Sequence, residues 1–153
     1  MTAVSVREAD YVAEYTTIRA IRFAVFVDEQ HVPASIEMDE RDPECIHVLA
    51  FVDGEAVGTG RLDVAKHGKI GRVAVLARAR GYGVGSALMA RLHEIARRYG
   101  LTDVWCNAQV AAAPFYEKLG YRRVGAVFDE AGIDHIRMIK SLGSEPLDSV
   151  KGL

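Results

Sequence analysis

The sequence has only two cysteines, Cys45 and Cys106, among its 153 residues. Two cysteines do not build the disulfide framework that stabilises small secreted proteins. Neither the cysteines nor the five histidines follow a Cys-x-x-Cys or His-Glu-x-x-His spacing, so the sequence predicts no zinc site. We therefore expect reduced thiols and no metal.

Long apolar runs and an excess of positive charge are also missing. No apolar stretch is long enough to cross a bilayer. Residues 1–8 lack the basic region, followed by an apolar one, that marks a signal peptide. The net charge of −2 does not favour binding to nucleic acid. These absences predict a cytoplasmic protein with no membrane partner and no nucleic-acid partner.

What is present is the composition of an ordinary globular domain, with 50% hydrophobic and 26% charged residues. We expect one domain over residues 1–140 and a loose tail over residues 141–153. Strand patterns cover residues 3–7, 46–52, 56–64, 70–76, 103–108, 122–128 and 133–139. Helix patterns cover residues 9–26, 83–99 and 114–120, and residues 28–44 are expected to form a loop. This order predicts an α/β (α+β) fold, in which a mixed sheet is flanked by helices.

A glycine turn between a strand and a helix is the most informative stretch of the chain. The strand at 72–76 leads into the turn Arg80–Gly85, and a helix pattern follows. Glycine lets a ligand approach the backbone closely, and the first turn of a helix offers free N–H groups and a positive dipole end. The turn is therefore predicted to bind a phosphate or pyrophosphate. It lacks the Gly-Lys-Ser/Thr sequence that ends a Walker loop. It also lacks the acidic residue that binds the ribose in a dinucleotide-binding fold. Both absences disfavour an unrelated nucleotide-binding domain.

Two motifs give the chain a family resemblance. Arg80, Gly83 and Gly85 follow the strand with the spacing Arg-x-x-Gly-x-Gly, and residues 107–121 read as a late strand and a helix ending in Phe-Tyr-Glu-Lys-Leu-Gly-Tyr. Together they resemble the acetyl-CoA loop and the Phe-Tyr helix of the GNAT superfamily of N-acetyltransferases. The resemblance implies an acyl-CoA N-acyltransferase that uses acetyl-CoA (coenzyme A) as co-substrate and no metal. It also implies that the central strands splay apart to admit the pantetheine arm.

The resemblance assigns cofactor binding to the glycine turn, to the strand before it and to the later motif. The turn would hold the pyrophosphate, and the splayed strands at 72–76 and 104–108 would hold the pantetheine arm. The cofactor-binding residues expected on this basis are Val73, Ala74, Val75, Arg80, Gly81, Tyr82, Gly83, Val84, Gly85, Ser86, Asn107, Phe115, Tyr116 and Lys118.

Acetyl transfer to an amine needs a donor for the developing oxyanion and a proton for the leaving thiolate. A backbone N–H within Val73–Val75 is expected to serve the oxyanion. Tyr116 is expected to be the general acid, because a phenol with a pKa of about 10 is protonated at neutral pH. The alternative for Tyr116 is a core aromatic whose hydroxyl reaches the surface. Asn107, the second catalytic candidate, either binds cofactor amides or belongs to a turn, whereas Cys106 is expected to pack.

The acceptor site is expected near the segment 28–44, which is crowded with acids. A negative rim would attract a protonated amine, and this makes Glu29, Glu37 and Asp39 substrate-binding candidates. Residues 25–33 and the acids after them also resemble a GNAT subgroup of mostly unassigned substrate. The alternative is a solvated acidic loop without a role in binding.

Two histidines in predicted strands, His47 and His135, complete the substrate-binding candidates. The alternative for each is a core or surface residue without a role in binding. The predicted function is transfer of an acetyl group from acetyl-CoA to a primary amine, on a small cationic molecule, by direct attack. The alternative is a non-catalytic module that binds acyl-CoA and regulates a partner. A homodimer stays open.

Overall fold

The computed structural model describes residues 3–143, which form two compact units. The first unit contains residues 3–63 and 70–92, and the second contains residues 64–69 and 93–143. The single domain expected over residues 1–140 stays a prediction. Of the tail expected to be loose, residues 144–153 lie outside the described part. Ser141, however, ends a strand, and the N–H of Leu142 donates to the carbonyl of Thr102 at 2.8 Å.

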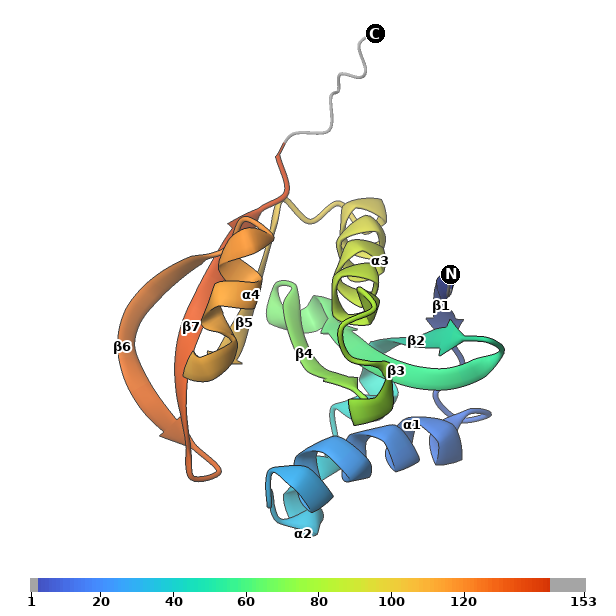
Figure 1. The fold of residues 1–153 in the computed structure, drawn as a ribbon. Helices are drawn as coiled ribbons and strands as arrows, with labels where there is room; N and C mark the ends of the chain where they lie inside the picture. The colour runs from blue at the N-terminus through green and yellow to red at the C-terminus, as the bar shows by residue number, and fades with distance from the viewer. Residues whose placement is uncertain (1–2, 144–153) are drawn as a thin grey trace, which may run out of the picture. The chain divides into compact units, whose positions relative to one another are not determined.

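The first unit is built on four neighbouring strands (Figure 1), which are β1 (Val4–Ala9), β2 (Ile46–Val52), β3 (Glu55–Asp63) and β4 (Lys69–Val75). β1 pairs antiparallel with β2, and β2 with β3. Asp53 and Gly54 join β2 to β3 with φ of 52° and 78°, the left-handed values that a two-residue type I′ hairpin requires. The strands expected at 46–52, 56–64 and 70–76 are confirmed, with small shifts at their ends.

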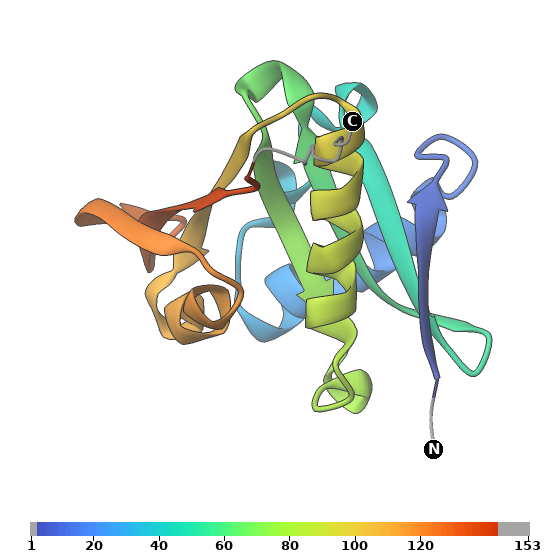
Figure 2. The same ribbon diagram turned by 90° about the horizontal axis from the view of Figure 1, so that it is seen from above.

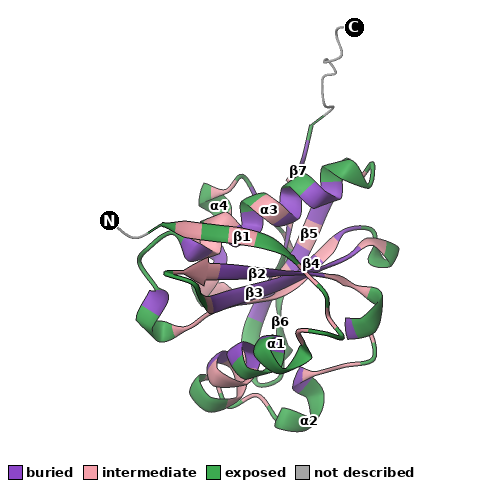
Figure 3. Cartoon of the chain, turned by 90° about the vertical axis from the view of Figure 1, so that its right-hand side faces the viewer, coloured by how far each residue is buried: buried purple, intermediate pink, exposed green. Residues whose placement is uncertain are grey.

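Helices cover both faces of this sheet (Figure 2), namely α3 (Val84–Arg98) on one face and α1 (Tyr15–Arg22) with the π-helix η1 (Phe23–Glu29) on the other. α3 packs closely on β3, because a Cβ at Gly58 or Gly60 would lie 3.0 or 3.1 Å from the side chain of Leu88 or Leu92. On the other face, Ile18, Ile21 and Val25 of α1 and η1 pack with Leu49 and Ala74. β2 and β3 are therefore buried along most of their length (Figure 3).

The segment expected to be a loop, residues 28–44, is partly helical. It contains the short helix α2 (Ala34–Glu37), which begins directly after Pro33, and the 3-10 turn η2 (Asp42–Glu44), which holds Pro43. Proline suits the start of a helix because its φ is fixed and its missing N–H is not needed there. The other 3-10 turns of the described residues are η3 (Val64–Lys66), η4 (Ala77–Ala79) and η5 (Val110–Ala112).

The second unit is an antiparallel sheet with α4 (Ala113–Lys118) beside it (Figure 1). Its strands are β5 (Asp103–Gln109), β7 (Ile133–Ser141) and β6 (Arg122–Glu130), in that spatial order. At the start of β4, Lys69 pairs in parallel with Trp105 of β5. Parallel and antiparallel pairs together confirm the predicted mixed sheet flanked by helices. The splay of the central strands stays a prediction.

The two faces of the second unit's sheet differ in character. Because side chains alternate along a strand, Cys106 and Met138 lie on one face, where both are buried. Trp105, Asn107 and Arg137 lie on the opposite face, which we name the Trp105 face, with Asn107 directly opposite Arg137 in the register. Within residues 3–143, no helix is long and apolar enough to cross a membrane.

Candidate active site

The glycine turn of the first unit has the geometry expected of an anion site. β4 ends at Val75, the turn η4 follows, and α3 begins at the buried Val84. Gly81 and Gly83 have φ of 87° and 79°, and a Cβ at either would meet no atom within 4 Å. The left-handed backbone therefore requires glycine, while the space beside it is open. The turn fits a phosphate group at the start of α3, where helical N–H groups lack intrahelical partners.

Arg80 at this turn is held by two contacts. Its Nε donates to the carbonyl of Val75 at 3.0 Å, and its Nη2 lies 2.7 Å from Oε1 of Glu29. The structure thus joins a residue predicted to bind the cofactor to one predicted to bind the acceptor. The two side chains are 47% and 37% exposed, and an exposed ion pair of this kind adds little stability. Arg80 is therefore able to exchange Glu29 for a more highly charged pyrophosphate.

The acids Glu37 and Asp39 lie inside a network of ion pairs. Nε of Arg22 lies 2.8 Å from Oε2 of Glu37, and Nη1 of Arg61 lies 2.8 Å from Oδ1 of Asp39. Arg72 contacts both acids, with Nε 3.3 Å from Glu37 and Nη2 3.1 Å from Asp39. With Asp42 included, the network consists of Arg22, Glu37, Asp39, Asp42, Arg61 and Arg72. Three arginines face three carboxylates, so the charges of these six residues are matched.

Burial makes this network tight. Arg22, Glu37 and Asp42 are 1%, 3% and 0% exposed. Burial alone would raise the pKa of Asp39, but its hydrogen bond and ion pair with Arg61 outweigh burial and lower that pKa to about 2. For Glu37 burial dominates over the bond from Arg22, and the pKa is raised. Burial would also raise the pKa of Asp42, but its contacts with Arg22, with the N–H of Asp39 and with Arg61 together outweigh burial and lower that pKa.

His47 belongs to the interior beside this network. Its Nε2 donates to the carbonyl of Asp42 at 2.8 Å, and its ring stacks on Tyr11 with centroids 4.5 Å apart. Burial lowers its pKa, so the ring stays neutral. At 1% exposure, His47 presents no surface to an amine in this structure, and packing is the role that its contacts support.

Arg72 also has an unusual backbone conformation. Its φ is 53°, although it lies within β4 and a non-glycine residue in the left-handed region is strained. Its Nε donates to the carbonyl of Glu37 at 3.1 Å. The residues that follow Arg72 are Val73–Val75, which are expected to supply the oxyanion donor. The network therefore holds the side chain at the point where the strand departs from its regular course.

Tyr116 lies in an aromatic cluster of the second unit. Its ring meets Tyr121 edge-on at 5.5 Å and Phe115 at 5.1 Å. Burial, with the neighbouring Cys106 thiol, raises the pKa of Tyr116, so its hydroxyl remains protonated at neutral pH. The hydroxyl of Tyr121 is 2.7 Å from Nε2 of His93. These contacts agree both with a proton donor and with a packed aromatic, and the general-acid role stays a prediction.

The remaining candidates of the second unit lie on the Trp105 face and on α4. Oδ1 of Asn107 is buried and has no hydrogen-bond partner within the described residues. His135, 7% exposed, donates from Nδ1 to the carbonyl of Ile133 at 2.7 Å and lies beside the ring of Phe128. Lys118 is exposed at the end of α4. Residues 73–86 of the predicted cofactor set thus belong to the first unit, and residues 107–118 belong to the second.

Sequence reasoning missed two residues of this face. The guanidinium of Arg137 lies 4.3 Å from the centroid of the Trp105 ring, and neither residue was a candidate. The alternation of side chains in residues 103–108 and 133–139 could have predicted that Trp105 and Arg137 each lie on a polar face of their strand. That the two side chains meet could be predicted only with the register of β5 with β7. Among the described residues, no group of three or more His, Cys, Asp or Glu side chains could hold a metal.

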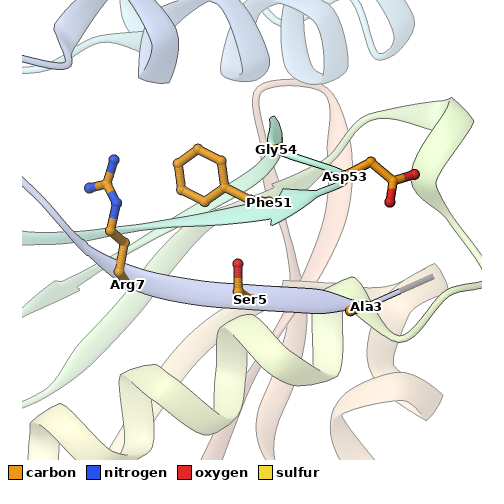
Figure 4. A pocket seen from close by; sticks show the side chains of 6 residues that line it. All are labelled: Ala3, Ser5, Arg7, Phe51, Asp53 and Gly54. Carbon is orange, nitrogen blue, oxygen red and sulfur yellow. The ribbon is translucent and has the colours of Figure 1, made fainter.

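A shallow hollow lies elsewhere on the first unit, over β1 and β2 (Figure 4). Its lining residues are Ala3, Ser5, Arg7, Phe51, Asp53 and Gly54. The guanidinium of Arg7 lies 4.9 Å from the ring centroid of Phe51 and also pairs with Glu14. None of the residues predicted for the site lines this hollow.

Comparisons with known proteins show the family of the chain. Residues 8–142 match the family model described as an acetyltransferase (GNAT) domain. The uncharacterised N-acetyltransferase YjcF of Bacillus subtilis is 40% identical over 122 residues, which cover 78% of this chain and 87% of that protein. The crystal structure of an acyl-CoA N-acyltransferase from Pseudomonas aeruginosa has a TM-score of 0.79 at 31% identity, covering 92% of this chain and 100% of that one. The crystal structure of Escherichia coli ElaA has a TM-score of 0.80 at 28% identity, covering 90% of this chain and 99% of that one.

Proposed function

Because the chain belongs to the acetyltransferase (GNAT) family, we propose that it transfers an acetyl group from acetyl-CoA to a primary amine. Members of this family are acyl-CoA N-acyltransferases, so the chain is an enzyme. The observation that carries the proposal is the turn Arg80–Gly85, with its left-handed glycines and open space at the start of α3. A pyrophosphate bound there is stabilised by backbone N–H groups, by the helix dipole and by Arg80.

The reaction is direct acyl transfer without an acyl-enzyme. The amine nitrogen first loses its extra proton to solvent or a base and then attacks the thioester carbonyl carbon. A C–N bond forms, the C–S bond breaks, and the nitrogen releases one further proton. The CoA thiolate takes up one proton, so that the products are an amide and free CoA.

Two groups of the chain are assigned to this step. A backbone N–H within Val73–Val75 donates to the oxyanion, and one such donor contributes about 3 kcal/mol of transition-state stabilisation. Tyr116 is assigned to protonate the thiolate, and burial, which raises its pKa, keeps the hydroxyl protonated at neutral pH. Asn107 accepts a hydrogen bond from an N–H of a bound ligand, since its Oδ1 has no partner among the described residues.

Glu37 and Asp39 do not carry the charge preference for the acceptor. Glu37 and Asp39 were expected to form a negative rim for a cationic amine. Their carboxylates already pair with Arg22, Arg61 and Arg72. These two acids therefore give little support to a cationic acceptor.

The test combines ligand binding with turnover. Acetyl-CoA at millimolar concentration should raise the melting temperature of the wild-type protein, because a ligand that binds only the folded state stabilises it. Gly83→Asp should abolish this shift, since it places a side chain and a negative charge in the turn. Release of free CoA over a panel of primary amines then identifies the acceptor class.

Replacement of Tyr116 by Phe tests the general acid. It should leave acetyl-CoA binding intact and lower kcat by about 10²–10⁴-fold. The alternative of a non-catalytic acyl-CoA-binding module predicts the thermal shift without any CoA release. Absence of both would count against the whole proposal.

A further inference from the structure

Arg137 is an arginine whose charge faces no carboxylate. Within the described residues no acid lies within 4 Å of its guanidinium, and its recorded contact is the Trp105 ring, 4.3 Å away. The arginines of the network in the first unit, by contrast, each pair with carboxylates at 2.7–3.3 Å. A guanidinium stacked on an aromatic ring keeps its N–H edges available for a planar anion. The guanidinium of Arg137 is therefore available to bind a carboxylate, which the described residues do not supply.

The ring beneath Arg137 is fixed in place. Nε1 of Trp105 donates to the carbonyl of Lys66 at 3.0 Å, and Trp105 is paired with Lys69 in the sheet. Nζ of Lys69 lies 5.3 Å from the centroid of the same ring. The ring is therefore a fixed platform for the guanidinium of Arg137.

Asn107 adds a hydrogen-bond acceptor to the same face. It lies directly opposite Arg137 in the register of β5 and β7, and side chains at opposed positions have Cβ atoms about 4.5–5.5 Å apart. Its Oδ1 is buried without a donor, a state that costs free energy unless a ligand completes it. A donor N–H and a carboxylate on one small molecule could therefore reach Asn107 and Arg137 together.

We propose that the Trp105 face binds the acceptor of the reaction, and that this acceptor carries a carboxylate beside its amine, as an amino acid does. The carboxylate pairs with Arg137, and an N–H of the acceptor bonds to Oδ1 of Asn107. This inference rests on the proposed acetyl transfer, and it reverses the charge expected of the acceptor. A purely cationic amine lacks the group that would pair with Arg137.

Matched acceptors that differ only in the carboxylate test the proposal. Lysine and cadaverine form one pair, and phenylalanine and phenethylamine form another. In CoA release with saturating acetyl-CoA, the member with the carboxylate should have a kcat/KM about 10-fold or more above its partner. Phenylalanine methyl ester should behave like phenethylamine, and a dipeptide with a free C-terminus separates a free amino acid from a peptide end.

Replacement of Arg137 by Met should raise KM for the carboxylate-bearing acceptor by about 10–100-fold. It should leave the KM for acetyl-CoA and the kinetics of phenethylamine nearly unchanged, which a general loss of structure would not do. Arg137→Lys should recover part of the loss. Arg97→Met, which removes an exposed charge from the same unit, is the control and should change neither acceptor.

A second readout does not depend on turnover. Trp105 is the single tryptophan of the chain, so its fluorescence reports directly on this face. In protein saturated with CoA, phenylalanine should change the emission saturably and at lower concentration than phenethylamine, and Arg137→Met should shift that midpoint about 10-fold or more upward.

Two results would overturn the inference. One is turnover that favours cadaverine and phenethylamine, with Arg137→Met acting equally on both members of a pair; acetyl transfer would then stand without a carboxylate site. The other is fluorescence that does not respond to phenylalanine. Saturable fluorescence without CoA release would instead support the binding site while contradicting acetyl transfer to these acceptors.

Discussion

The arginines of the first unit and Arg137 of the second differ in what lies opposite their charge. Arg22, Arg61 and Arg72 face carboxylates that were themselves candidates for substrate binding. Arg137 faces an aromatic ring and has no carboxylate within 4 Å among the described residues. A charged side chain that is matched within the chain contributes to the fold, whereas an unmatched one is available to a ligand. The comparison therefore supports our proposal that the Trp105 face, and not the acidic segment, binds the acceptor.

The largest effect that separates the two regions is on stability. Arg22→Met should remove one partner from each of the buried carboxylates of Glu37 and Asp42, which costs about 3–5 kcal/mol of unfolding free energy. Arg137→Met should cost less than about 0.5 kcal/mol, as expected for a surface residue. Urea unfolding of both variants measures the difference. Equal losses would break the comparison, because Arg137 would then be as structural as Arg22.

Acid titration should show the next largest effect. The pKa of Asp39 is about 2 in the folded protein, against 3.8 as its ordinary value. Its ion pair therefore stabilises the fold above pH 4, and that contribution is lost as the pH falls from about 4 to 2. The raised pKa of Glu37 acts in the opposite direction, since the folded state then takes up a proton more readily.

Asp39→Asn isolates this contribution, because the effects of the other acids cancel in the difference from wild type. The unfolding free energies of the two proteins should differ by about 2 kcal/mol at pH 5 and converge towards pH 2. A difference that stays constant with pH would show that Asp39 acts through packing and not through its charge.

Arg72 offers a smaller and more local test. Its left-handed φ of 53° is strained for any residue with a Cβ. If the strand itself, and not the ion pairs with Glu37 and Asp39, holds that conformation, Arg72→Ala loses the pairs and keeps the strain, whereas Arg72→Gly loses both. The glycine variant should then be the more stable by about 1 kcal/mol and should retain more of kcat. Equal stability of the two variants would mean that the ion pairs hold the conformation, because the backbone of the alanine variant would have relaxed.

Features set by a few neighbouring residues could be predicted from the sequence. The hairpin turn at Asp53 and Gly54, Gly81 and Gly83 of the anion turn, and the end of α3 at Gly100 all depend on local backbone conformation, and each has the expected left-handed φ. The alternation of side chains likewise gave the strands. The family resemblance gave the mixed sheet and the acyl-CoA chemistry, because its two motifs are continuous in the chain.

Features that depend on distant residues could not be predicted in this way. Arg22 pairs with Glu37 and Asp42, and Arg72 with Glu37, over separations of 15, 20 and 35 residues. A sequence shows an acidic run but not the arginines that fold against it. Similarly, Arg137 meets Trp105 only through the register of β5 with β7, which no local pattern fixes.

The smallest effect concerns Glu29, which lies between the two kinds of charge. It pairs with Arg80 at 2.7 Å, but both side chains are well exposed, so the pair is weak and exchangeable. If Glu29 forms a rim for a cationic acceptor, Glu29→Gln should raise the KM of that acceptor and leave the KM of acetyl-CoA unaffected. If Glu29 instead pairs with the arginine that binds the pyrophosphate, the substitution should change the binding of the cofactor.

Glu29→Gln should then tighten CoA binding by a factor of about 2–5, within the range of an exposed ion pair. Titration calorimetry with CoA measures this effect, which should shrink at high salt because exposed charges are screened. The unfolding free energy should stay within about 0.5 kcal/mol of wild type. Weaker CoA binding by the variant would show that Glu29 orients Arg80 for the pyrophosphate, and would place this pair with the matched arginines of the network.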